Sequence, residues 1–548
     1  MDCKIIELRA DRNLLRSNFD GYKLSLEPVA IVKEKLQATP DRVHQSDAQY
    51  SFLHAELFSL QNHLIHDPWT SDTSYYIDTT WMVRRVQYGL QEGRFKPIGS
   101  VFRVRKSAER LAGHFNLTIV FISEKFAVIG DGVAWIEIVD TGDRTRAQEW
   151  KQLAHVRAIP DEKAGFVLRD ARLEIQEECR KIHCLLMRIE QTDGVFESVL
   201  EWIAIDLSEK KVSTHRELRS RSSIFYSVLT SNSSGVIVAA GKAVKFTYDS
   251  ENPIVDDIPN VQEEDYTWKQ TDEDIVITFR EREEAEKSDY QVKFIGKEIS
   301  VQFKEDIVLK GELFAEIDKD LTTWNLHNKS FQVTLVKSVE GENWPHLLPG
   351  ERLEEESQPN ESEIFSLDNK IEDCDRGDDD ADHFLARFDG GTHRMTHKAN
   401  LGSCSPLFAL PSLRPGQPAA IALRHDVDCC LWLPLQTPGE WILRHEGTLD
   451  AFAYVLASKQ QRKYVSCAPD LSYAVICEPE RHVFIYKAKY DTATGLRKRS
   501  GPQVTLGQQK VVSLENAGGQ VIGMTVLNEV TLLLTEESIL SLQVNIEQ

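Results

Sequence analysis

The sequence predicts an all-β protein, in which a β-propeller of seven or eight blades is interrupted by an inserted antiparallel β-sandwich. Three observations support this prediction. Short apolar segments recur at intervals of roughly 40–60 residues through most of the 548-residue chain. A strand-rich stretch, residues 265–348, lies between two acidic segments. The strand-rich regions on either side would each leave an open ring with exposed edges if it folded alone. Together they hold about 390–415 residues, which suits seven blades, with eight as the alternative.

Residues 1–250 are predicted to form the first part of the propeller. Residues 1–20 look only partly structured, and Phe19–Leu26 is the first expected strand. The hairpin around the turn Gly130-Asp131-Gly132 has the clearest signal, because glycine permits the tight reversal. The other expected strand pairs are 74–79 with 81–86, 185–190 with 199–205, and 236–240 with 244–248.

Residues 384–548 are predicted to complete the same propeller. The expected strands are 383–390, 420–427, 430–432, 451–457, 473–477, 482–486, 521–526, 530–534 and 539–544. We expect the strand near Tyr22–Leu26 to pair with the last strands, near Leu534–Val544, and thereby to close the ring. Residues 251–264 and 349–383 are predicted to be acidic linkers, and the second of these to be disordered, because it is highly charged and poor in apolar residues.

Residues 265–348 alternate apolar and polar positions, which is typical of half-buried antiparallel strands. Seven residues in this stretch follow a recognisable order: Trp268, Gln270, Gly311, Leu313, Trp324, Trp344 and Pro345. On these residues the stretch resembles the CS domain of the NudC family, a β-sandwich. Most of the seven are expected in its core. A sandwich of this type offers a partner its exposed faces and edges rather than a reaction centre.

The resemblance to the NudC family extends over nearly the whole chain, through residues 19–27, 75–79, 423–428, 454–459, 467–469 and 481–486. It implies a non-enzymatic protein of the cytoplasm and nucleus with a co-chaperone role. The partners it implies are the ninety-kilodalton heat-shock chaperone machinery, propeller-type clients and dynein-regulatory factors. A DEAH-box RNA helicase is a further implied partner.

Charge is distributed unevenly along the chain. Residues 349–383 contain 14 acidic and 3 basic residues, and residues 265–348 contain 18 and 11. The segment 249–264 adds 6 acidic residues, so the rest of the chain is close to neutral although the total is −22. This acidity argues against direct nonspecific binding of nucleic acid, which depends on Lys and Arg contacts to phosphates. It leaves a basic protein partner open.

Composition also predicts no membrane association and no oxidising compartment. No apolar run reaches the roughly 18–20 residues of a membrane span. The first residues lack the basic, apolar and small-residue pattern of a secretory signal. The nine cysteines show neither CxxC nor zinc-ligand spacing, so we expect reduced thiols.

The sequence lacks the motifs of nucleotide-binding loops, of α/β-hydrolase serines and of HExxH zinc enzymes, so no catalytic residue, cofactor or metal is predicted. His393 and His397 lie four residues apart, but on a loop and a strand they would not share a metal. Residues 425–428, His-Asp-Val-Asp, are expected in a blade turn in which Asp accepts backbone hydrogen bonds. Cys429 and Cys430 are expected as one core and one surface residue. The basic runs 215–221 and 497–499 are interpreted as solvated hairpin loops, with partner contact or a nuclear address as the alternative.

The sequence therefore favours a non-enzymatic co-chaperone or adaptor, which binds proteins through the propeller and the tethered CS domain. The alternative is a dedicated partner and regulator of a DEAH-box RNA helicase, bound mainly through the propeller.

Overall fold

The computed structural model forms two compact units: residues 1–254 with 375–548, and residues 255–374. It describes residues 3–545 except for these positions: 107–108, 160–164, 177–178, 193, 255–265, 272, 280–288, 296, 305, 328–329, 340, 342–343, 345–346, 349–382, 403, 412, 438–439, 488–495 and 498–502. The predicted disordered linker, 349–383, lies outside the described residues except for His383, which begins a strand. The charged run 281–287 and residues 498–499 of the second basic run also lie outside them.

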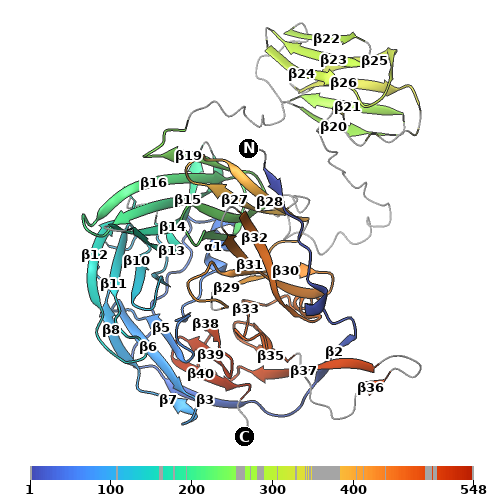
Figure 1. The fold of residues 1–548 in the computed structure, drawn as a ribbon. Coiled ribbons are helices and arrows are strands. Elements are labelled where there is room, and N and C mark those ends of the chain that lie inside the picture. Colours follow the sequence, from blue (N-terminus) through green and yellow to red (C-terminus); the bar gives the residue numbers. More distant parts are fainter. Residues whose placement is uncertain are drawn as a thin grey trace. The chain divides into compact units, whose positions relative to one another are not determined.

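The described residues of the first unit form seven β-sheets, numbered here in chain order (Figure 1). Sheet 1 contains β4 (Ile65–His66), β5 (Thr73–Ile77), β6 (Met82–Gly89), β7 (Arg94–Phe95) and β8 (Gly99–Arg103). Sheet 2 contains β9 (Thr118–Phe121), β10 (Phe126–Gly130), β11 (Trp135–Asp140) and β12 (Lys151–Arg157). Sheet 3 contains β13 (Val167–Gln176), β14 (Cys179–Thr192), β15 (Val195–Asp206), β16 (Lys211–Ser220) and β19 (Val244–Asp249).

Sheet 4 contains β17 (Ile224–Leu229), β18 (Gly235–Ala240), β27 (His383–Asp389), β28 (Met395–Gly402) and β1 (Lys4–Ile5). Sheet 5 contains β29 (Phe408–Leu410), β30 (Ala420–His425), β31 (Asp428–Thr437) and β32 (Glu440–Leu449). Sheet 6 contains β33 (Tyr464–Cys467), β34 (Tyr473–Cys477), β35 (His482–Lys487), β36 (Leu496–Arg497), β37 (Gln503–Ser513) and β2 (Phe19–Leu24). Sheet 7 contains β38 (Val521–Val526), β39 (Val530–Thr535), β40 (Ser538–Gln543) and β3 (Ala30–Lys35).

Hydrophobic cores join each sheet to the next and sheet 7 back to sheet 1. Ile129 of sheet 2 packs in one core with Tyr75 of sheet 1, for example, and Leu532 of sheet 7 packs with Tyr76 of sheet 1. Because each sheet is covered on both faces, central strands such as β18, β34 and β39 are buried at every position. This closed cycle of packed sheets is the predicted propeller.

Most of the strand pairs that were predicted as hairpins are observed, such as β5 with β6 and β14 with β15. The turn at Asp131 is as expected, because its carboxylate accepts three backbone N–H groups at 2.8–2.9 Å, from Val133, Ala134 and Trp135. The predicted pairing of 236–240 with 244–248 is wrong. Strand β18 pairs with β17 and β27, whereas β19 crosses to the outer edge of sheet 3 and pairs with β16. The chain thus leaves sheet 4 after β18 and returns to it as β27.

The prediction of which N-terminal strand closes the ring is also wrong. Strand β2, which includes Tyr22, runs parallel to β37 in sheet 6. The strand that closes the ring is β3, which pairs antiparallel with β40 from Ala30↔Gln543 to Lys35↔Ser538. Closure through the N-terminal region and the last strands is therefore observed, but one strand later in the chain.

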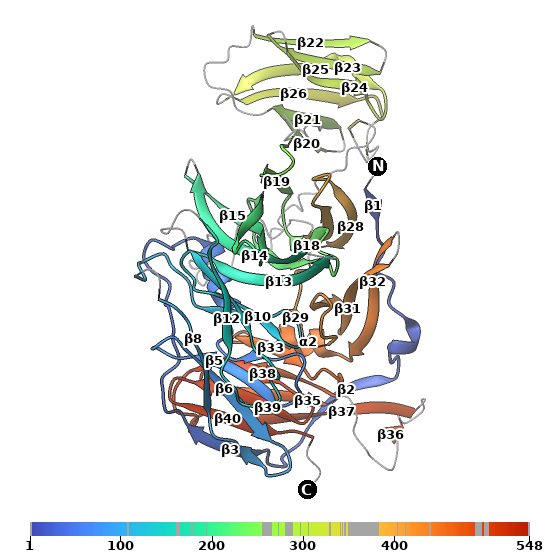
Figure 2. The same ribbon diagram turned by 60° about the vertical axis from the view of Figure 1, so that its left-hand side comes forward.

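Residues 3–35 carry β1, a 3-10 helix, β2 and β3, and they follow the outer edges of four successive sheets (Figure 2). Strand β1 lies parallel to β28. The chain then passes β32 of sheet 5 through the 3-10 helix η1 (Arg12–Leu14), where the Asp11 N–H donates to His445 Nδ1 at 3.0 Å. Strands β2 and β3 complete the segment. We call residues 3–35 the N-terminal belt.

Among the described residues of the first unit there are two short α-helices: α1 (Phe52–Ser59) and α2 (Phe452–Ala457). Residues 451–457 were predicted as a strand, and this is wrong. The apolar run is short enough to suit either structure, and Phe452, Ala453 and Leu456 bury one helical face. No helix among the described residues is long and apolar enough to cross a bilayer.

The second unit is a sandwich of two antiparallel sheets. One contains β20 (Tyr266–Gln270), β21 (Asp274–Phe279), β26 (Ser330–Lys337) and β25 (Ile317–His327) in that order. The other contains β22 (Tyr290–Ile295), β23 (Glu298–Phe303) and β24 (Asp306–Glu312). Its core draws only on residues 266–348, so the sandwich has a hydrophobic core of its own.

Candidate protein-interaction sites

Three of the signature residues, Gln270, Gly311 and Trp344, lie in or against the closing segment of the sandwich, which runs from Trp344 to Leu348. The Gln270 side chain donates to the Trp344 carbonyl oxygen at 2.9 Å and accepts from the Trp344 N–H at 2.9 Å. Lys337 Nζ donates to the same Gln270 oxygen at 2.9 Å. The amide of Gln270 therefore clamps the closing segment to the entry strand β20.

Gly311 and Leu313 contact the other end of this segment. A Cβ at position 311 would lie 2.8 Å from Leu348 Cδ1, so glycine is required there for close packing. The N–H of Phe314, next to Leu313, donates to the Leu347 carbonyl at 3.2 Å. Trp268, Leu313 and Trp344 are buried in the core. Pro345 lies outside the described residues.

Trp324 differs from the other signature residues because it is 36% exposed. It pairs across the ladder with the buried Val333, so it belongs to the core-facing side of β25. Strand β25 is, however, the edge of its sheet, and nothing among the described strands covers its outer side. Leu321, on the same strand, is 62% exposed. An edge strand with exposed apolar side chains is suited to binding a partner chain.

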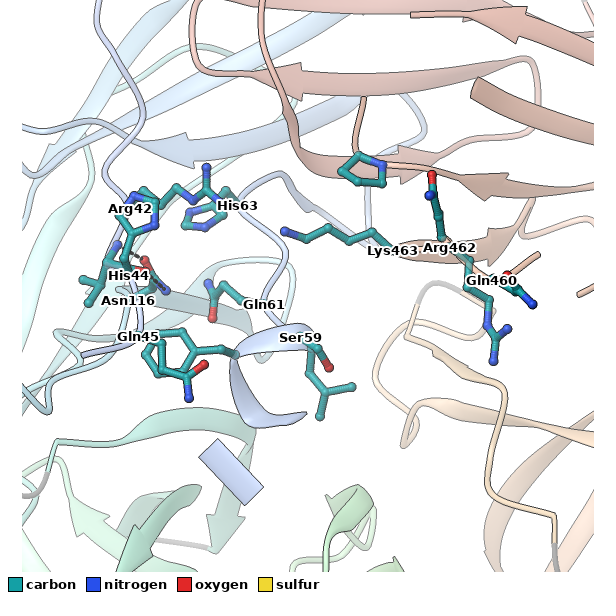
Figure 3. A pocket seen from close by; sticks show the side chains of 15 residues that line it. Arg42, His44, Gln45, Ser59, Gln61, His63, Asn116, Gln460, Arg462 and Lys463 are labelled. Carbon is teal, nitrogen blue, oxygen red and sulfur yellow. Dashed lines mark hydrogen bonds between the residues drawn. The ribbon is translucent and has the colours of Figure 1, made fainter. Parts of the chain in front are cut away.

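A pocket of about 620 Å³ lies in the first unit, lined by four segments of the chain and by Pro479. The segments are residues 42–45 after β3, residues 58–61 with His63 at the end of α1, Asn116 before β9, and residues 460–463 before β33. Figure 3 shows Lys463 extending from the β33 side toward His63 and Arg42 on the other side. The walls are anchored to the sheets: the His63 N–H donates to Ile522 O at 3.1 Å.

The lining is strongly cationic. It contains Arg42, Arg462 and Lys463 together with His44 and His63, and no Asp or Glu occurs among the lining residues. Burial, and then repulsion by Arg42 and Lys463, lowers the pKa of His63 to about 4. Burial and then the charge of Arg42 lower the pKa of Lys463. Sequence analysis missed this site, because none of its four segments carries a basic run or a known motif.

The segments that sequence analysis singled out are structural. His393 Nε2 contacts Asp249 Oδ2 at 2.7 Å, whereas His397 on β28 contacts its neighbour Thr396, so the two histidines have separate partners. Asp428, the first residue of β31, accepts the N–H of Ala451, which lies after β32, at 2.6 Å.

Two of those predictions are corrected. Cys429 and Cys430 are both buried, in different cores, because sheet 5 is packed on both faces. Residues 215–220 form strand β16 rather than a loop. The basic residues there are paired, as in the contacts of Arg216 with Asp249 at 2.8 Å and Arg219 with Glu190 at 2.6 Å. These two arginines are therefore already paired with carboxylates.

A closed ring of β-sheets, with a separately packed sandwich inserted in the sequence between β19 of sheet 3 and β27 of sheet 4, defines a class of propeller scaffolds that bind other proteins. Residues 264–337 match the CS domain family. NudC domain-containing protein 1 of Mus musculus is 30% identical over 589 residues, covering 100% of both chains. The Xenopus tropicalis protein of the same name is 29% identical over 587 residues and 98% of both chains. The chain belongs to the NudC domain-containing protein 1 family.

Among solved structures, the C-terminal WD40 domain of Sif2 aligns with 89% of this chain and 97% of its own, at 9% identity and a TM-score of 0.32. The CS domain, the propeller fold and the family together point to a non-enzymatic, protein-binding role.

Proposed function

We propose that the protein is a non-enzymatic co-chaperone or adaptor, which binds protein partners through both the propeller and the CS sandwich. The observation that carries the proposal is the insertion itself. The sandwich has its own core, forms a separate compact unit and lies in the sequence between β19 and β27. Two recognition modules in one chain raise the effective concentration of each beside the partner of the other.

The CS sandwich would contact its partner through β25. This strand is the edge of its sheet among the described residues and carries Trp324 and Leu321, and an extended partner segment can add to it as a further strand. Family membership supports chaperone machinery and propeller-type clients as the partners. We further propose that the protein acts in the cytoplasm and nucleus.

The alternative is that the protein is a dedicated partner and regulator of a DEAH-box RNA helicase, bound through the propeller. The pocket between α1 and β33 favours a propeller surface that recognises its partner without the sandwich.

Affinity capture from cell extract with mass spectrometry separates the two. The full-length protein is compared with a variant lacking residues 265–348, which keeps both linkers, and with Trp324→Ala. Co-chaperone function predicts that chaperone components are lost in both variants. A matched control, Val339→Ala, removes an exposed apolar side chain elsewhere on the sandwich, 60% exposed, and should capture normally. Retention of every partner after the deletion would assign recognition to the propeller and refute the role of β25.

A further inference from the structure

The cationic pocket stands out in a chain with a net charge of −22. Three permanent cations line it, Arg42 on one wall and Arg462 and Lys463 on the other, and Lys463 extends across toward Arg42 (Figure 3). Only Arg42 has a carboxylate partner, Glu536 at 3.1 Å, and the Glu536 side chain is 50% exposed. Within the described part of the chain, neither Arg462 nor Lys463 forms an ion pair.

The two remaining cations are held by contacts that do not neutralise them. Arg462 Nη1 donates to the carbonyl oxygens of Lys459 at 3.0 Å and Leu456 at 3.4 Å. Lys463 Nζ lies 5.6 Å from the centre of the Tyr464 ring. The side chains are therefore fixed in place by the protein while their charges remain available.

Like charges gathered in a partly buried pocket repel one another, and the interaction strengthens as water is excluded. The lowered pKa values of Lys463 and His63 show this repulsion, although burial is the larger cause for both. An anion bound in the pocket would attract each of these cations and so offset the repulsion between them. The pocket is thus complementary to negative charge.

We propose that this pocket binds an acidic peptide segment of a protein partner, with Arg42, Arg462 and Lys463 contacting its clustered carboxylates. The proposal rests on the function proposed above, and it names the chemistry that the propeller recognises. Amide and hydroxyl groups of Gln45, Gln61, Gln460 and Ser59 surround the cations, and they suit the donors and acceptors of a peptide backbone.

Size and surroundings favour a peptide over a nucleic acid. The volume of about 620 Å³ is that of a pocket for a compact ligand and accommodates a few side chains. A nucleic acid would instead require a basic stripe following many phosphates. The basic strand β16 offers none, because its cations are already paired.

Fluorescence anisotropy with the full-length protein and a labelled hexaglutamate peptide tests the proposal. We expect binding that weakens as salt rises from about 50 to about 150 mM, because partly exposed charges are screened. The double variant Arg462→Gln/Lys463→Gln should weaken binding at least about tenfold, the equivalent of one lost charge-assisted contact. The matched control Lys23→Gln/Lys96→Gln removes two exposed lysines outside the pocket and should change the affinity less than about twofold.

The thermal midpoint of the double variant should equal or exceed that of the unmodified protein, because the substitutions relieve repulsion. If the thermal midpoint of the double variant falls, the test is repeated with a single substitution of the exposed Arg462. Arg462→Glu should then still abolish hexaglutamate binding. Equal affinity in the pocket variant and the control overturns the proposal. So does tighter binding of a hexathymidylate oligonucleotide, or displacement by inorganic phosphate as effective as by peptide. Because no chaperone is present, failure here is distinguishable from failure of the co-chaperone function.

Discussion

The N-terminal belt is predicted to stabilise the ring mainly through Tyr22. Its hydroxyl donates to the Asp450 carbonyl oxygen at 2.6 Å, which ties β2 to the end of sheet 5. Its ring meets those of Tyr486 and Phe19 edge to face, with centroids 4.9 and 5.1 Å apart. On the facing strand β37, a Cβ at Gly507 would lie 2.5 Å from Tyr22 Cδ1. Tyr22 therefore occupies space that only glycine leaves free.

These contacts set the expected magnitudes. Tyr22→Phe removes one hydrogen bond and should cost about 1 kcal/mol. Tyr22→Ala also removes two aromatic contacts, each contributing about 0.5–1.5 kcal/mol, so the total should be about 2–4 kcal/mol. Gly507→Ala forces the ring to move and should cost about 1–3 kcal/mol. The control Gly99→Ala lies in a strand where the nearest atom to the added Cβ is 4.0 Å away, and it should cost little.

Hydrogen exchange with mass spectrometry is the appropriate assay, because a protein of several units does not unfold in a single step. Peptides from β2 and β37 should exchange faster in the order Tyr22→Phe, then Tyr22→Ala, while peptides from sheet 2 stay unchanged. Gly507→Ala should cost less when Tyr22 is already alanine, because the clashing ring is gone. Strictly additive effects of the two substitutions would refute the proposed packing of Tyr22 on Gly507.

Three further predictions concern single contacts. Gln270→Ala leaves two backbone groups of the closing segment without partners and should destabilise the CS sandwich by about 2–3 kcal/mol in urea, whereas the exposed Gln291→Ala should not. Asp131→Ala removes the acceptor of three buried N–H groups and should cost about 2–4 kcal/mol, measured by the thermal midpoint against Asp131→Asn, which keeps one acceptor oxygen. Burial raises the pKa of Glu56 to about 7, against an opposing effect of Arg169. Folding therefore favours its protonated form, so stability should fall by roughly 1–3 kcal/mol between about pH 4.5 and 8, and Glu56→Gln should flatten that dependence.

The strands themselves were predictable from sequence, because short apolar segments bounded by turn residues mark them. Which strands pair was less predictable. Strands β18 and β19 are adjacent in sequence, yet they belong to different sheets. The short connection between them, which contains Gly241 and Lys242, suits a hairpin, so the sequence did not reveal the crossing. Both Tyr22 and Val32 lie in segments suited to the outer edge of a sheet, so the sequence did not reveal which one closes the ring.

The burial of individual side chains was predicted wrongly where a strand was assumed to have one buried and one exposed face. That assumption holds for the sandwich, where Ile275 and Ile277 point inward and Val276 between them is only partly buried. In the ring both faces of a sheet are covered, and adjacent residues such as Cys429 and Cys430 are both core. The pocket was beyond sequence analysis for a different reason: Arg42 and Lys463 are more than 400 residues apart and meet only after the ring has closed.

The long connection between β18 and β27, which contains the CS unit, adds only a small entropic cost to the pairing of these strands. Strands β18 and β27 are separated by residues 241–382, yet they pair in register from Gly235↔Asp389 to Ala240↔Phe384. Closing so long a connection instead of a short hairpin costs only about 3 kcal/mol, because the cost grows with the logarithm of length. Both faces of this strand pair are packed, against sheet 3 and against sheet 5, and β1 covers the outer strand β28. These contacts fix β18 beside β27 whatever lies between them. A ring lacking residues 265–348 should therefore close as the intact one does, which is what allows the deletion to report on recognition rather than on folding.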